Sequence, residues 1–137
     1  MCHQFSKTTW GGWEPPNREL KLSENELNWK KQIEEQYKCE ITYIGLDDAF
    51  MEDSIIYMHI MCDVDSDLQS NLNDSLNEIT KNIATSFLQS SQGRTEQDCI
   101  RISYGNIYFN ESAKKLKYPT TKKCRYSIKT NETMEIE

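Results

Sequence analysis

No apolar run in this 137-residue sequence approaches the ~20 residues that a membrane-spanning helix needs. The first ten residues contain no hydrophobic segment of the signal-peptide type. There is no Cys-x-x-Cys pair, no Gly-rich phosphate loop, no Gly-x-Ser-x-Gly elbow and no Glu-x-Lys on an expected strand. These absences argue against a membrane span, a zinc ribbon, a thioredoxin-type site, an NTPase, an α/β-hydrolase and a metal-dependent nuclease.

Positive charge is missing from a long stretch of the chain, since no lysine or arginine occurs between Lys38 and Lys81. From Lys114 to Lys129 the balance reverses, and no acid occurs there. The basic candidates for a binding loop are Lys114, Lys115, Lys117, Lys122, Lys123 and Arg125. The net charge of −6 disfavours nucleic-acid binding by the molecule as a whole, because phosphates would be repelled. It favours soluble behaviour.

The five cysteines, which are Cys2, Cys39, Cys62, Cys99 and Cys124, leave two interpretations open. Four of them fall in or beside apolar, strand-like runs, which favours buried free thiols in the reducing cytoplasm. The alternative is a cell-envelope lipoprotein domain. In that case Cys2 would carry the lipid, and the other four would form two disulfides in an oxidising compartment.

The chain length suits one domain, preceded by an irregular arm at residues 1–22 and followed by a fraying tail at 131–137. Ser23 and Glu26 have the spacing of a capping box, which predicts a helix over residues 24–37. A second helix is expected over 66–90. Its apolar residues recur every three or four positions: Leu68, Leu72, Leu76, Ile79, Ile83 and Phe87.

Strands are expected where the apolar period falls to two, at 40–46 and 55–64, and these should pair as an antiparallel hairpin. Further strands are expected at 99–104, 107–109 and 124–128, with the first two either separate or one long strand. The predicted domain at 23–130 is therefore α+β. It has an antiparallel sheet of about four or five strands with the helices on one face, in the order α-β-β-α-β-(β)-β.

No catalytic, metal or cofactor site emerges from the motifs. His59 lies inside an apolar strand, where a structural histidine is the more common occurrence. The run from Asp63 to Asp67 resembles the start of a calcium loop, but Leu68 replaces the required glycine. Whether the chain is an enzyme stays open. If it is one, we expect an acidic active site around His59, Asp47, Asp48 and Asp53.

The favoured hypothesis is a non-enzymatic, acidic protein-binding module, such as an inhibitor, immunity or antagonist protein that acts on a partner with a basic groove. An acidic surface attracts such a partner at long range. Trp10 and Trp13, next to glycine and proline, add candidate contacts. The acidic candidates are Asp47, Asp48, Glu52, Asp53, Asp65 and Asp67.

Overall fold

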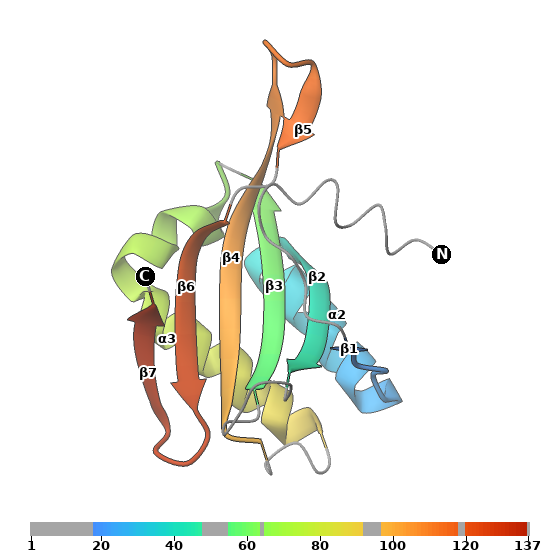
Figure 1. Ribbon diagram of the computed structural model, residues 1–137, viewed down its shortest axis with the longest axis vertical. Helices are drawn as coiled ribbons and strands as arrows, with labels where there is room; N and C mark the ends of the chain where they lie inside the picture. The colour runs from blue at the N-terminus through green and yellow to red at the C-terminus, as the bar shows by residue number, and fades with distance from the viewer. Residues whose placement is uncertain (1–17, 48–54, 64, 92–96, 118–119, 137) are drawn as a thin grey trace.

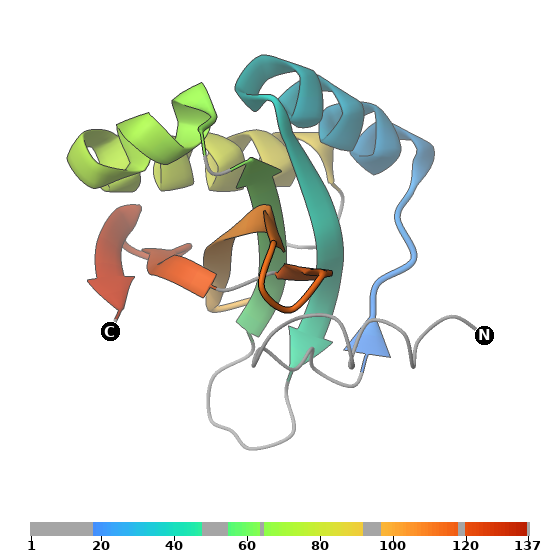
Figure 2. The same cartoon turned by 90° about the horizontal axis from the view of Figure 1, so that it is seen from above.

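The computed structural model describes residues 18–47, 55–63, 65–91, 97–117 and 120–136, and these form a sheet with helices on one face (Figures 1 and 2). The elements are β1 (Arg18–Glu19), α2 (Glu24–Tyr37), β2 (Cys39–Asp47), β3 (Ile55–Asp63), α3 (Asp67–Ser90), β4 (Cys99–Asn110), β5 (Lys115–Lys117), β6 (Thr120–Ser127) and β7 (Glu132–Ile136). None of the helices described is long and apolar enough to cross a bilayer. The predicted α+β class, with helices on one face of a mostly antiparallel sheet, is confirmed.

The strands lie in the order β1-β2-β3-β4-β6-β7, with β5 paired to the far end of β4. The predicted hairpin of β2 with β3 is present and runs from Cys39 opposite Cys62 to Asp47 opposite Ile55. One pair departs from the antiparallel expectation, because β3 and β4 are parallel. The reason is the 24-residue helix α3, which carries the chain back along the sheet so that Cys99 starts beside Ile55.

Helix α2 begins where the capping box predicted. The Ser23 hydroxyl accepts from the Glu26 amide at 3.2 Å, and the Glu26 carboxylate accepts from the Ser23 amide at 2.8 Å. Two orphan amides of the first turn are thereby bonded. The helix ends at Lys38, which takes the left-handed conformation with φ 55° and turns the chain directly into β2. Its inner face buries Trp29 and Ile33.

Helix α3 carries the predicted apolar stripe, and all six of its members are buried. Buried polar bonds fix its position on the sheet: the Thr80 hydroxyl lies 2.7 Å from the Tyr104 hydroxyl of β4. The ring of Phe87 packs edge-on against Trp29 of α2, with centroids 4.9 Å apart. The helix is interrupted at Ser75, whose φ of −128° and ψ of 28° are not helical. The stripe therefore covers the sheet in two helical segments that meet at Ser75.

The C-terminal third differs most from expectation. The segments 99–104 and 107–109 belong to one strand, β4, as in one of the two alternatives predicted for them. The predicted basic loop, which begins at Lys114, instead contains β5 and the start of β6. The tail predicted to fray forms β7 on β6, because Asn131 adopts φ 61° and closes a turn in which its side chain accepts from the Tyr126 hydroxyl at 2.7 Å. At the other end, the predicted irregular arm includes β1, and residues 1–17 lie outside the described part.

Candidate functional site

Of the acidic residues proposed from the sequence, the three that the structure places lie at two separate ends of the hairpin. Asp47 ends β2, whereas Asp65 and Asp67 stand at the start of α3, beyond the opposite end of the hairpin. A nine-residue strand separates the two positions by about 27 Å. That separation exceeds the Debye length of about 10 Å at 0.1 M salt, so the charges of the two groups are largely screened from each other. Asp65 and Asp67 are exposed.

Five of the residues proposed as contacts lie outside the described part of the chain. They are Trp10, Trp13, Asp48, Glu52 and Asp53. Of the hairpin group, only Asp47 is placed, through its backbone pairing with Ile55. The proposed role of these residues stays a prediction.

The basic residues proposed as one loop are spread over one turn, two strands and both faces of the sheet. Lys122 lies on the side that faces the helices, next to Cys124, and pairs with Glu135 at 3.6 Å. Lys123 and Arg125 alternate with it and lie on the other face. Arg125 stands opposite Arg101 in the β4–β6 ladder, which places two cations side by side. The predicted loop is therefore not one uniform contact surface.

The remaining basic residues lie at the far end of the sheet. Lys114 has a φ of 56° and closes the turn between β4 and β5. Lys114 and Lys115 are exposed there, and Lys117 ends β5. This hairpin extends beyond the body of the domain (Figure 1).

His59 is fully buried in β3, and its Nδ1 lies 3.0 Å from the Thr42 hydroxyl of β2. Burial lowers the pKa of its imidazole to about 4. At neutral pH the ring is thus uncharged and out of solvent, which suits a structural role. Asp47 pairs with Ile55, four positions along β3 from His59, so these two do not meet. Within the described segments, no group of three or more His, Cys, Asp or Glu side chains is arranged to hold a metal ion.

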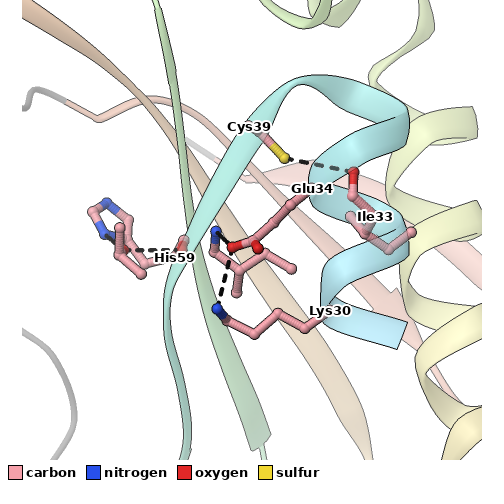
Figure 3. A network of polar contacts seen from close by, with 7 residues as sticks. Lys30, Ile33, Glu34, Cys39 and His59 are labelled. Carbon is pink, nitrogen blue, oxygen red and sulfur yellow. Dashed lines mark hydrogen bonds and ion pairs between the residues drawn. The ribbon is translucent and has the colours of Figure 1, made fainter. Parts of the chain in front are cut away.

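The edge of the sheet formed by β2 is closed by neighbouring groups. Strand β1 pairs with Gly45 and Leu46, and the Leu20 amide donates to the Ile44 carbonyl at 2.8 Å. Farther along, the Ile41 amide donates to the Glu34 carboxylate of α2 at 2.9 Å (Figure 3).

The same carboxylate pairs with Lys30 at 3.2 Å, also drawn in Figure 3. A register shift between Ile41 and Tyr43 bends the strand at this point. Bulges and covered amides are the features by which edge strands resist pairing with other chains.

The opposite edge, formed by β7, has none of these features among the described residues. Strand β7 continues the ladder from β6 without a register shift, and no described strand lies beyond it. Its sequence, Glu-Thr-Met-Glu-Ile, contains no proline and no lysine. Met134, at its centre, is 61% exposed. Such an edge offers a row of amides and carbonyls for pairing with a further strand.

Acidic side chains flank this edge. Glu132 and Glu135 are exposed on β7 itself. The first half of α3 lies alongside β6 and β7 in both views of the fold (Figures 1 and 2), and the Cys124 thiol donates to the Asn77 side chain at 3.4 Å. Asp74 and Glu78, which neighbour Asn77 on the helix, are exposed. The basic residues of this region are Lys122, which is paired with Glu135, Lys81 on α3, and Lys123 and Arg125 of β6. Lys123 and Arg125 stand opposite Ile136 and Met134, on the face of the sheet away from the helices.

No match to this chain was found among protein-family models, curated proteins or solved structures. The β7 edge, which sequence reasoning missed, is the candidate site that the described residues define most completely. The signal for it was present in the turn residue Asn131, which tolerates a left-handed conformation, followed by alternating Met134 and Ile136.

Proposed function

We propose that this chain is a non-enzymatic protein-binding module that holds an extended, basic segment of its partner along the outer edge of β7. The observation that carries the proposal is the combination of a regular, exposed edge strand with acidic side chains on two adjoining elements. The partner strand would take its affinity from main-chain hydrogen bonds to β7. It would take its selectivity from charge.

The acids contribute at two ranges. Exposed carboxylates on α3 and β7 attract a cationic partner over about one Debye length, which raises the association rate. Once a strand is in place, its side chains alternate across the new ladder. Lysines or arginines on one side would then meet Glu132, and those on the other would meet Glu135, because these two residues of β7 point to opposite faces.

An inhibitory or antagonist role is the form of binding that fits these residues, because occupying a partner's basic segment needs no catalytic group. The buried histidine at the centre of the sheet supports this interpretation. His59 has a lowered pKa and is out of solvent, so it is unsuited to acid–base chemistry on an external substrate.

The proposal is tested with the purified protein and three sets of extended peptides of equal length, in which lysine, glutamate or serine alternates with valine. The lysine set should bind most tightly, and its affinity should fall as salt rises. Amide resonances of residues 132–136 should shift on binding, while those of 41–46 at the closed edge should not.

A matched pair of variants locates the site. Asp74→Asn with Glu78→Gln removes two flanking charges and should slow association of the lysine peptides. Glu24→Gln with Glu35→Gln removes two exposed charges from α2 and should leave association unchanged. Equal affinity for the lysine and serine sets, or amide shifts that avoid β7, would disprove the proposal.

A further inference from the structure

One pair of the four described cysteines lies within bonding reach, as the strand register shows. Cys39 begins β2 and stands directly opposite Cys62 of β3 in the antiparallel ladder. Opposed residues in such a ladder have Cα atoms about 4.5 or 5.5 Å apart. A disulfide requires about 4.4–6.8 Å between Cα atoms, so the backbone spacing suits a cross-strand bond without strand movement.

The other described cysteines are excluded from this bond by the sheet. Cys124 is on β6, two strands from β3, and adjacent strands are about 4.8 Å apart, which places it beyond the disulfide limit of about 7 Å. Cys99 precedes Ile100, which points into the core beneath the helices, so the Cys99 side chain lies on the opposite face. The described cysteines can therefore form at most the bond between Cys39 and Cys62.

Both thiols of this pair make only long, weak hydrogen bonds in the structure. The Cys39 sulfur donates to the Ile33 carbonyl at 4.0 Å (Figure 3), and the Cys62 sulfur donates to the Gly105 carbonyl at 3.7 Å. None of the four described cysteines forms a disulfide in this structure. Rotation about the Cα–Cβ bonds would exchange two weak sulfur contacts for a covalent bond. The rest of the hairpin can stay in place.

We propose that Cys39 and Cys62 form a redox-active dithiol, which a small disulfide such as oxidised glutathione converts into a cross-strand disulfide. Cys39 is the partly exposed member and attacks first, whereas Cys62 is buried. The Cys39 thiolate bonds to one glutathione sulfur and expels the other as a thiolate, which takes up a proton. The Cys62 thiolate then attacks the Cys39 sulfur and expels the second glutathione. Two protein thiols are oxidised, and one glutathione disulfide is reduced to two thiols.

The surroundings of Cys39 set the speed of this reaction. Burial raises its pKa to about 12, with smaller contributions from the neighbouring Cys62 thiol and the Glu34 carboxylate. The attacking species is the thiolate, so the rate should be slow at neutral pH and rise about tenfold for each pH unit between 7 and 9. This pair would respond to sustained oxidising conditions and not to brief ones.

The experiment uses the full chain, in the wild-type form and with Cys2→Ser, because Cys2 lies outside the described residues. Each protein is equilibrated with excess oxidised glutathione, free thiols are blocked with an alkylating agent, and proteolytic fragments are identified by mass spectrometry. The expected product is a 39–62 disulfide with the loss of two hydrogen atoms. Cys99→Ser and Cys124→Ser should form it at the wild-type rate.

Two further variants test the order of attack. Cys62→Ser should stop at a mixed disulfide of glutathione with Cys39. Cys39→Ser should form a mixed disulfide with glutathione far more slowly, because the remaining thiol of the pair, Cys62, is buried. Circular dichroism of both variants checks that the fold is kept. The proposal is overturned if no 39–62 disulfide forms at equilibrium, if a different pair is bonded, or if the wild type stops at the mixed disulfide.

Discussion

The two edges of the sheet differ in how the chain deals with unpaired backbone groups. At the β2 edge, β1 pairs with the end of the strand, and the Glu34 carboxylate accepts from the Ile41 amide. At the β7 edge, among the residues described, the strand is regular and Met134 is exposed. Glutamate occurs at both edges, but with different effects. Glu34 occupies a backbone donor, whereas Glu132 and Glu135 lie beside donors that no described strand occupies.

This difference shows that an acidic residue near a strand is not by itself a binding feature. Glu34 belongs to a helix that packs against the strand, so its carboxylate reaches the backbone and closes it. The glutamates of β7 belong to the edge strand itself and project away from the main chain. Position relative to the hydrogen-bonding direction decides whether such an edge is closed or open.

The largest expected effect comes from removing support under the open edge. Leu72 of α3 is fully buried, in the half of the helix that lies beside β6 and β7. Leu72→Ala should lower the free energy of unfolding by about 2–5 kcal/mol, because it deletes apolar contacts and leaves a cavity. Urea denaturation measures the change. Leu27→Ala, on a side chain that is 51% exposed, should change it by less than about 0.5 kcal/mol. Similar losses for both variants would mean that the core is misassigned.

The next effect concerns the centre of the sheet beside the closed edge. The pKa of His59 is lowered from 6.5 to about 4, so the folded state holds the neutral ring while the unfolded state binds a proton below pH 6.5. The contribution of His59 to the free energy of unfolding is therefore fully present above pH 6.5. It is lost as the pH falls towards 4, by at most about 3 kcal/mol. Urea denaturation at a series of pH values measures this slope. His59→Gln should flatten the slope, and an unchanged slope would assign the pH dependence to other groups.

A smaller loss of stability is expected when the closed edge is opened. Glu34→Ala removes the acceptor of the Ile41 amide and should lower the free energy of unfolding by about 1–2 kcal/mol. Hydrogen exchange at Ile41 should accelerate at the same time. Glu34→Gln keeps an acceptor oxygen and should lower the free energy of unfolding by less. Glu35→Ala, at an exposed neighbouring position, should leave the free energy of unfolding almost unchanged. Wild-type exchange at Ile41 in the alanine variant would show that Glu34 does not close this edge.

The smallest effect on stability is expected at the open edge. Met134→Lys introduces a charge of the kind that discourages strand addition, and because the side chain is exposed, stability should change by less than about 0.5 kcal/mol. Binding of lysine–valine peptides should nevertheless weaken, as measured by titration calorimetry. Leu27→Lys, the same charge on exposed helix surface, should leave binding unchanged. Equal weakening by both variants would show that net charge, and not the edge, governs binding.

Much of the fold could be predicted because its signals are local. The capping box of Ser23 with Glu26 and the apolar stripe of α3 depend on residues three or four positions apart, and both are present as predicted. The hairpin of β2 with β3 follows from two apolar segments joined by a short connection. The candidate site could not be predicted in this way. Its parts, β7 and the first half of α3, are distant in sequence and meet only through the sheet.

By itself the sequence determined where the helices begin, which residues of α3 face the core, and that the class is α+β. The tertiary structure decided that β3 and β4 are parallel, that Cys39 faces Cys62, and that the last residues pair instead of fraying. The physical reason is range. Caps and periodicity arise from contacts within one helical turn or along one strand, whereas register and edge exposure depend on which segments pack together.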